Sequence, residues 1–203
     1  MWLDSMAKDP KSVSRRELLT FWRKPLQQLK EDVIPTKPAT PPTPVPTRPP
    51  PLRPPGMMHE IMLQNACIRC GKCVEACPAD AIRPLDASWG KKMEGTPAIF
   101  ARQQPCVLCD GLQCSHVCPS GALIPVYVPK DVTMGTALLD SSRCVTYAGQ
   151  ACDRCKAVCL IEETLVLDEH GRMTVNEDRC VGCGLCEKAC PTEPTSIRVQ
   201  PRD

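Results

Sequence analysis

The sequence predicts a small, loop-rich α+β fold that follows an extended N-terminal arm. Three observations predict it: cysteines come in regular groups, bulky side chains are scarce, and prolines concentrate in one stretch. The 203 residues contain sixteen Cys but only three Trp, two Tyr and two Phe. With so few large apolar side chains, we expect centres held by the cysteines to fill the middle of the fold.

The cysteines form four groups of four, separated by longer stretches. The first and fourth groups share the spacing CxxCxxCxxxC, and each is followed by proline. The second group has four residues, instead of two, between its second and third cysteines. The third group has seven residues between its first two cysteines and is followed by Leu160. In chain order the groups are Cys67, Cys70, Cys73 and Cys77; Cys106, Cys109, Cys114 and Cys118; Cys144, Cys152, Cys155 and Cys159; and Cys180, Cys183, Cys186 and Cys190.

The shared spacing indicates iron–sulfur chemistry. The run CxxCxxCxxxCP is typical of bacterial ferredoxins, in which the fourth cysteine ligates the other [4Fe–4S] cluster of a pair. Three thiolates on one tight loop can reach three corners of a cubane. We therefore expect all sixteen cysteines to be iron ligands of four [4Fe–4S] clusters, in two bacterial dicluster ferredoxin-like modules, tandem or nested. Such a chain is predicted to transfer electrons, with no catalytic residues and no substrate site of its own.

Other uses of the same cysteines fit the spacing less well. A zinc-binding structural adaptor would use CxxC knuckles a dozen or more residues apart. A disulfide scaffold would need eight bridges among thiols that are mostly too close in sequence, and no secretory signal is evident. Among electron-transfer proteins, the alternative is the iron–sulfur subunit of a molybdoenzyme or hydrogenase complex.

The positions of the regular groups favour a nested pairing within the cluster domain, residues 57–203. Groups one and four are regular, whereas groups two and three are irregular. We therefore expect an outer module, residues 57–100 plus 165–203, to enclose an inner module, residues 101–164.

Nested pairing assigns each fourth cysteine to a partner group. Cys77 would complete the cluster of group four and Cys190 that of group one. Cys159 would complete the cluster of group two and Cys118 that of group three. Sequential pairing, of group one with two and of three with four, is the rival.

Residues 1–33 form the predicted N-terminal arm. Ser14 and Glu17 have the spacing of a capping box, and apolar residues follow at helical intervals, which predicts an amphipathic helix over Ser14–Leu29. Residues 1–56 carry ten Lys and Arg against five Asp and Glu, whereas the remainder carries fifteen against eighteen. A basic helix ahead of an acidic body predicts docking to a redox partner or a membrane surface, and a solvated terminus without a binding role is the alternative.

The same arm bears on cellular location. Arg15 and Arg16 resemble a twin-arginine export signal, but Arg23 and Lys24 fall where such a signal needs an uncharged apolar stretch. A cytoplasmic, membrane-associated location is therefore favoured, and periplasmic location by twin-arginine export is the alternative. Nucleic-acid binding is not predicted, because the basic residues are not interleaved with aromatics. No apolar stretch reaches the ~18 residues of a transmembrane span.

Residues 34–56 are the predicted linker. From Pro35 to Pro55, eleven of twenty-one residues are proline. This composition disfavours helix and sheet and favours extended polyproline II conformation. We expect a stiff spacer between the arm and the cluster domain.

Around the cysteine groups, one helix is predicted over Met57–Asn65, and helix packing rather than a metal site is expected for Met57, Met58, His59 and Met62. His116 lies between two cysteines of group two. It is expected either to form a hydrogen bond near a cluster or to lie at the surface.

Short strands are predicted at Ala81–Ile82 and Ser196–Val199, after the cysteine loops. Leu165–Leu167 and Met173–Val175, separated by a turn that contains Gly171, predict a β-hairpin.

Several stretches together carry a resemblance to a known family. They are Leu52–Gly56, Cys67–Pro78, Gly95–Pro97, Pro105–Cys109, Cys118–Leu123, Met134–Ala137, the Cys144–Cys152 gap and Cys180–Pro191. Across residues 52–202 the sequence resembles the NapG/MauM-type polyferredoxins, which are associated with periplasmic nitrate reductase and methylamine dehydrogenase systems. The opening Ser14–Arg16 is similar to the start of NapF-type ferredoxins.

The resemblance implies four [4Fe–4S] clusters that relay electrons in a respiratory-type chain. The implied partners are redox proteins, among them a membrane quinol-oxidising complex or a molybdoenzyme complex. Leu160 departs from the family, which has proline at this position, and we expect a reshaped loop there.

Overall fold

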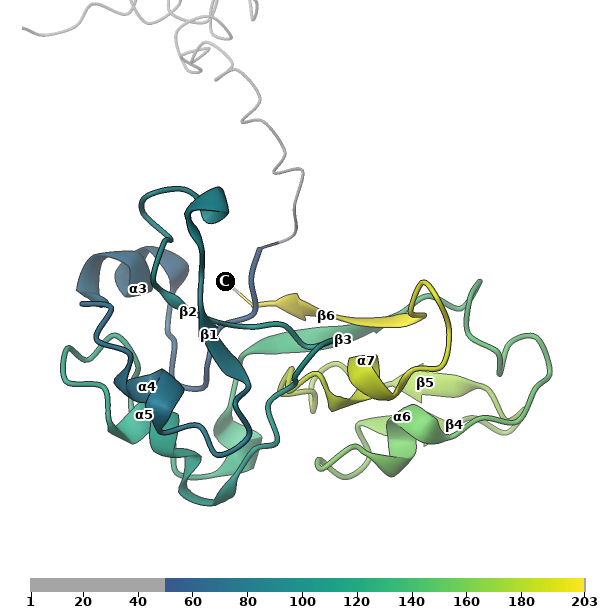
Figure 1. Ribbon diagram of the computed structural model, residues 1–203. Helices are drawn as coiled ribbons and strands as arrows, with labels where there is room; N and C mark the ends of the chain where they lie inside the picture. Colours follow the sequence, from purple (N-terminus) through teal and green to yellow (C-terminus); the bar gives the residue numbers. More distant parts are fainter. Residues whose placement is uncertain (1–49, 203) are drawn as a thin grey trace, which may run out of the picture. The chain divides into compact units, whose positions relative to one another are not determined.

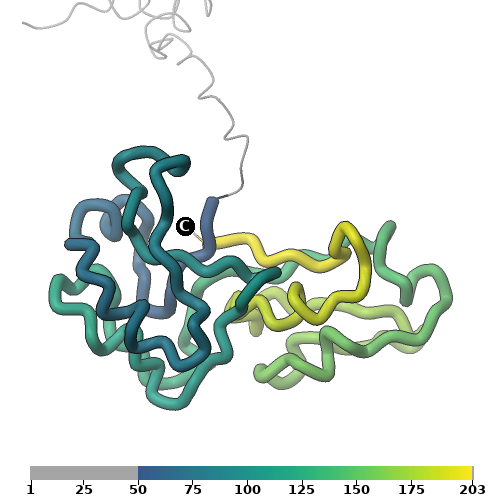
Figure 2. Tube along the Cα trace, viewed as in Figure 1, coloured from purple at the N-terminus to yellow at the C-terminus, as the bar shows by residue number. Residues whose placement is uncertain are grey.

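The computed structural model describes residues 50–202, shown as a ribbon in Figure 1 and as a tube in Figure 2. The predicted arm 1–33, its helix over Ser14–Leu29 and most of the linker lie outside the described residues. Short helices and strands joined by loops make up the described chain, which confirms the α+β prediction. Between residues 50 and 202, no helix combines the length and the apolarity needed to cross a membrane.

The first half of this body, residues 50–128, contains the first two cysteine groups. Its helices and strands are α3 (Glu60–Ala66), α4 (Lys72–Glu75), β1 (Ile82–Pro84), β2 (Pro97–Ile99) and α5 (Gln113–His116), with 3₁₀ helices at Ala87–Trp89 and Asp110–Leu112. β1 and β2 form an antiparallel pair with Ile82 opposite Ile99, and α4 packs against α5.

The second half, residues 129–202, contains the other two groups. Its elements are a 3₁₀ helix at Pro129–Asp131, β3 (Gly135–Leu139), α6 (Arg154–Ala157), β4 (Leu165–Leu167), β5 (Met173–Val175), α7 (Leu185–Ala189) and β6 (Ile197–Pro201). β3 pairs with β6 and β4 with β5, both antiparallel, and α6 packs against α7. The predicted hairpin has the predicted bounds. Figure 1 shows this green and yellow half beside the blue and teal one.

The helix predicted over Met57–Asn65 is present as α3. The ring of His59 caps it by accepting the Ile61 N–H at 3.2 Å. Leu63 faces the core, whereas Met58 and Met62 are 61% and 57% exposed. Met57 is partly buried and packs beside Leu63, as predicted, but the packing expected of Met58, His59 and Met62 is wrong, because a helix of two turns buries only one narrow stripe.

Each short helix within a cysteine group carries the third cysteine of that group. These residues are Cys73 in α4, Cys114 in α5, Cys155 in α6 and Cys186 in α7. Gly184 precedes α7 with a φ of +88°, a conformation that favours glycine. The chain therefore turns sharply from loop to helix and leaves the fourth cysteine just beyond the helix end.

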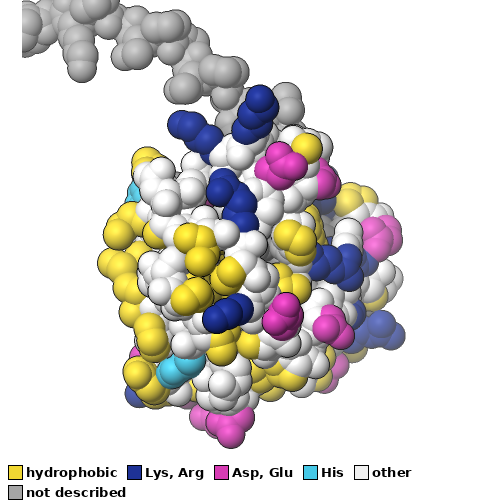
Figure 3. All heavy atoms as spheres, turned by 60° about the vertical axis from the view of Figure 1, so that its left-hand side comes forward, with side chains coloured by type: hydrophobic (Ala, Val, Ile, Leu, Met, Phe, Trp, Pro, Cys, Tyr) yellow, Lys and Arg dark blue, Asp and Glu magenta, His cyan; other side chains and the backbone are white. Residues whose placement is uncertain are grey.

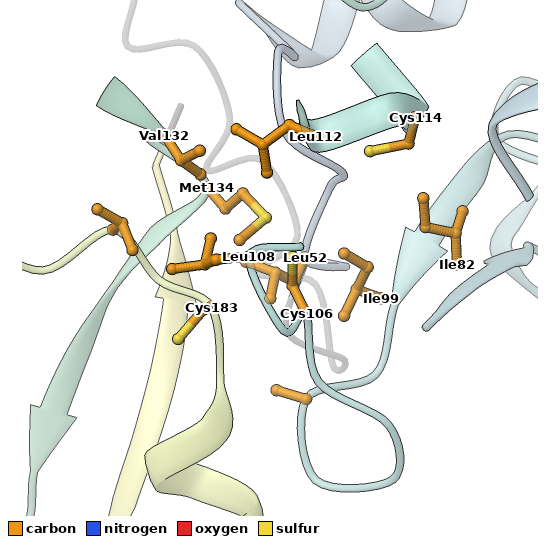
Figure 4. Packing of buried hydrophobic residues seen from close by; sticks show 12 residues of the cluster. Leu52, Ile82, Ile99, Cys106, Leu108, Leu112, Cys114, Val132, Met134 and Cys183 are labelled. Atoms are coloured by element: carbon orange, nitrogen blue, oxygen red, sulfur yellow. The ribbon is translucent and has the colours of Figure 1, made fainter. Parts of the chain in front are cut away.

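A hydrophobic core joins the two halves, as Figure 4 shows. Leu108 and Leu112 of the first half meet Val132 and Met134 of the second. Three cysteines, Cys106, Cys114 and Cys183, belong to the same core. The full set of buried members is Leu52, Ile82, Ile99, Ala101, Cys106, Leu108, Leu112, Cys114, Val132, Met134, Val181 and Cys183.

Polar contacts reinforce the junction between the halves. The guanidinium of Arg102 donates to the carbonyl groups of Glu187, Lys188 and Cys190, at 2.8, 3.1 and 2.9 Å. These carbonyls lie at the C-terminal end of α7, where a cation is stabilised by the helix dipole. Arg102 therefore ties the first half to the loop that carries group four.

The last residues of the predicted linker belong to the folded body. Leu52 is 5% exposed and pairs with Ile99 beside β2. Pro54 and Pro55 are fully buried. The boundary of the linker at residue 56 is therefore wrong, because a count of prolines conceals the apolar and charged side chains among them.

Arg53 anchors this segment. Its side chain is 1% exposed, and its guanidinium pairs with Glu60 at 2.5 Å. It also donates to the Thr96 hydroxyl at 3.1 Å and to the Pro97 carbonyl at 2.7 Å. Burial raises the pKa of Glu60, but hydrogen bonds from Arg53 and Gln64 outweigh burial and hold the pKa below its ordinary value.

Replacing Arg53 with Met is expected to destabilise the body by about 3 kcal/mol, because removal of one partner of a buried pair leaves the other without its counterion. Thermal unfolding of the cluster-loaded protein measures the loss. Arg83→Met is the control, since Arg83 is exposed and should change stability by no more than ~0.5 kcal/mol. Equal stability of the two variants would contradict the anchoring role.

Candidate metal centres

Four cavities in the structure are each lined by four cysteine side chains. In each, three cysteines come from one group and the fourth is the last cysteine of another. We call each set a centre, numbered by the group that supplies three members. Centre I is Cys67, Cys70, Cys73 and Cys118; centre II is Cys106, Cys109, Cys114 and Cys77; centre III is Cys144, Cys152, Cys155 and Cys190; centre IV is Cys180, Cys183, Cys186 and Cys159.

These sets contradict the nested pairing and follow the sequential rival. Cys77 lies with group two and Cys118 with group one. In the same way, Cys159 lies with group four and Cys190 with group three. The physical reason is local packing, because α4 lies against α5 and α6 against α7. Each fourth cysteine follows its helix and so lies beside the neighbouring helix. The outer and inner modules, 57–100 plus 165–203 and 101–164, do not describe these groupings.

The cavities differ in size. Centre I surrounds the widest, with a volume of about 310 Å³. The other three are narrow, between about 10 and 20 Å³.

The centres also differ in exposure. Cys70 of centre I is exposed, and Ile68 in the wall of the same cavity is 64% exposed. Cys180, Cys183 and Cys186 of centre IV are buried. Centre I therefore lies at the surface, whereas most of centre IV lies inside.

Backbone N–H groups donate to one sulfur in three of the centres. The pairs are Leu123 to Cys118 at 3.4 Å in centre I, Ala81 to Cys77 at 3.3 Å in centre II, and Ala137 to Cys180 at 3.2 Å in centre IV. Hydrogen bonds to ligating sulfurs stabilise negative charge and are a principal means of tuning cluster potential.

Centre III differs in adding hydroxyl groups, beside the backbone N–H groups of Lys156 and Thr192 that donate to Cys155 and Cys190. Thr146 Oγ1 lies 3.2 Å from Cys144 Sγ, and Thr192 Oγ1 and Ser196 Oγ each lie 3.2 Å from Cys190 Sγ. The sequence analysis missed these three side chains. A signal was present, because Thr146 and Thr192 each stand two residues after a cysteine.

Burial opposes ionisation of the inner thiols. Burial, reinforced by the neighbouring cysteines, raises the pKa of Cys106 and of Cys114 to about 12. Burial also acts on Cys190, but hydrogen bonds from Ser196 and Thr192 lower its pKa to about 6. A cationic core would hold the buried sulfurs as thiolates.

The donor chemistry fits iron–sulfur clusters. Each centre brings four cysteine side chains to the lining of one cavity, and a [4Fe–4S] cubane takes four thiolate ligands. Among residues 50–202, no three Cys, His, Asp or Glu side chains lie close enough together to bind a single metal ion.

His116 is exposed and occupies the surface position that was one of its two expected roles. Its Nε2 lies 3.0 Å from the carbonyl oxygen of Val126, and its ring meets Tyr127 edge-on at 4.8 Å.

Two protein-family models match the chain. A 4Fe-4S dicluster domain matches residues 66–122, and a 4Fe-4S binding domain matches residues 173–194. The first span contains every cysteine of groups one and two, which agrees with centres I and II as one pair.

Related proteins extend the match. Ferredoxin-type protein NapG of Escherichia coli (strain K12) is 40% identical over 159 residues, which cover 72% of this chain and 68% of NapG. Methylamine utilization ferredoxin-type protein MauM of Methylobacillus flagellatus is 41% identical over 159 residues, covering 73% of this chain and 67% of MauM. Polyferredoxin protein MvhB of Methanothermobacter marburgensis is 30% identical over 99 residues, which cover 47% of this chain and 21% of MvhB. With the domain matches, these relatives show an iron–sulfur protein that transfers electrons, and the chain belongs to the family of ferredoxin-type proteins NapG and MauM.

Proposed function

We propose that the protein relays electrons through four [4Fe–4S] clusters, one at each centre, between two redox proteins of a respiratory-type chain. When bound, each cluster accepts and returns one electron, while the chain supplies thiolate ligands, hydrogen bonds and spacing. The observation that carries the proposal is the arrangement of sixteen cysteines as four sets of four. We propose no catalytic residue, because electron transfer between clusters needs none.

A partner protein is proposed to dock at centre I. Met58, Ile61 and Met62 on the α3 side, with Ile68 in the cavity wall, are exposed apolar side chains. Figure 3 turns the first half forward and shows hydrophobic side chains gathered on one side of that face. Exposed apolar patches beside a redox centre are suited to brief protein contacts. If the chain is instead a subunit of a molybdoenzyme or hydrogenase complex, the same surface would form a permanent interface.

Cellular location is a separate proposal. Arg23 and Lys24 interrupt the apolar stretch that export requires, which favours the cytoplasmic side of the membrane. Cell fractionation with N-terminal sequencing tests this. Recovery outside the cytoplasm, with cleavage beyond Arg16, would establish the periplasmic alternative.

Iron and sulfide analysis tests both the cluster count and the ligand sets. The full-length protein is expected to bind about sixteen irons with equal sulfide, four per cluster, and to give the EPR spectrum of reduced [4Fe–4S] clusters. Zinc in place of iron, or about four irons without sulfide, would overturn the proposed function in favour of a structural adaptor.

Double variants distinguish the ligand sets. Cys77→Ala with Cys106→Ala changes two ligands of centre II and should remove about four irons. Cys77→Ala with Cys180→Ala changes ligands of two centres and should remove about eight. The reverse order of losses would support nested pairing.

A further inference from the structure

The four centres have a spatial order that differs from their order along the chain. Cys73 of centre I packs against the core that contains Cys114 of centre II. Centre II meets centre IV where the Cys106 N–H donates to the Cys183 carbonyl at 3.0 Å, and both residues appear in Figure 4. Centre IV meets centre III through the packing of α7 on α6. The contacts therefore connect the centres in the order I, II, IV, III.

Centre III lies at one end of this order, and its hydroxyl contacts have a fixed direction. Thr146 Oγ1 accepts the N–H of Met173 at 3.1 Å, which leaves its own proton for Cys144 Sγ at 3.2 Å. The Thr146 side chain is buried, so water does not compete for this proton.

A second sulfur of centre III receives two hydroxyls. Thr192 Oγ1 accepts the Ser196 N–H at 2.8 Å, and its proton then points to Cys190 Sγ. Ser196 Oγ lies 3.2 Å from the same sulfur. An iron-bound thiolate has no proton of its own, so both hydroxyls must be donors.

The neighbouring centre IV has a different environment. Its donors are backbone N–H groups alone, that of Ala137 to Cys180 and that of Leu185 to Cys183, and its Cys159 sulfur faces the carbonyl oxygen of Ile161 at 3.3 Å. A carbonyl oxygen gives a thiolate no hydrogen bond and repels its charge. At centre I the hydroxyl of Ser120 lies 3.6 Å from Cys118 Sγ, a longer contact than any of the three in centre III.

Donors near the sulfurs stabilise the extra electron of a reduced cluster, whereas a nearby carbonyl oxygen destabilises it. We propose that centre III has the highest reduction potential of the four and is the exit of a relay that runs I, II, IV, III. A reduced one-electron redox protein loses an electron to centre I, each centre is reduced and reoxidised in turn, and an oxidised one-electron redox protein accepts the electron at centre III. No atom or proton moves. The inference rests on the proposed function.

Redox titration of the full-length, cluster-loaded protein, monitored by EPR, tests this order. Ser196→Ala and Thr192→Val each remove one hydroxyl from Cys190. Each is expected to shift the highest of the four potentials to a more negative value, and the double variant should shift it further. The other three potentials should not move. Iron content must equal that of the unmodified protein in every variant.

Ser115→Ala is the matched control. Ser115 is also a buried serine beside a cysteine, but its hydroxyl donates to the Leu112 carbonyl at 2.9 Å and accepts the Val126 N–H at 3.0 Å. It should leave all four potentials unchanged. If the variants of Ser196 and Thr192 shift a potential other than the highest, or shift none, the inference is wrong although four clusters are bound. If fewer than four clusters are bound to begin with, the proposed function itself fails.

Discussion

Removal of iron from the loaded protein is expected to abolish its cooperative unfolding transition. Cys106, Cys114 and Cys183 belong to the core that joins the two halves, so the loss of metal leaves thiols and cavities where the centres were. Without metal, the protein would depend on the sheets of residues 50–202, which have two strands each. Isolated two-stranded sheets are marginally stable. Metal binding must therefore supply a free energy comparable to the whole stability of a domain, about 5 to 15 kcal/mol.

Circular dichroism during thermal unfolding measures this effect. The iron-loaded protein should unfold in one sharp transition, and protein treated with chelator and reductant should lose it. Reconstitution with iron and sulfide should restore it. A chelated protein that unfolds as sharply, at the same temperature, would show that the protein core suffices without metal.

Replacing Gly182 with Ala is expected to destabilise the loaded protein by about 3 kcal/mol. Gly182 has a φ of +74°, and an added Cβ would lie 2.3 Å from the backbone nitrogen of Gly135 in β3. A left-handed conformation costs a residue other than glycine about 1 to 2 kcal/mol, and overpacking adds about 1 to 3 kcal/mol. Since Gly182 lies between Cys180 and Cys183, the strain falls on centre IV, and loss of its iron should accompany the loss of stability.

Gly171→Ala separates the two contributions. Gly171 has the same φ of +74°, but an added Cβ would meet no atom within 4 Å. Its substitution should cost about 1 kcal/mol, from the backbone conformation alone, with full iron content. Chemical denaturation and iron analysis of both variants measure the difference. Equal losses would show that the close approach to β3 contributes nothing.

The cysteine spacing was sufficient to identify every cysteine that lines the four cavities, because three of the four cysteines of each centre lie close together in one run. The β-hairpin of β4 and β5 was also predictable from two apolar runs around a turn. By contrast, β2 begins at Pro97 and β3 at Gly135, and both lack the alternation that marks a strand. β2 forms by pairing with the preceding strand β1 and β3 by pairing with the distant β6, and a local pattern reveals neither partner.

The pairing of the groups could not be predicted for the same reason. Regular spacing in groups one and four says how each loop holds three thiols, but not which helix packs beside it. The sequence also concealed Arg53, because its role depends on Glu60 and Thr96, which lie outside the proline-rich segment. In both cases the decisive contact is between residues that are separated in the chain.

Sequential pairing has a consequence for the order of assembly during synthesis. All eight thiols of centres I and II lie between Cys67 and Cys118. The ribosome therefore completes both ligand sets before it reaches Cys144, whereas nesting would have left the first two groups incomplete until Cys159 and Cys190 emerged. Cys183 is synthesised late, so the hydrogen bond from the Cys106 N–H to the Cys183 carbonyl also forms late. The junction between centres II and IV is thus one of the last parts of the protein that can form.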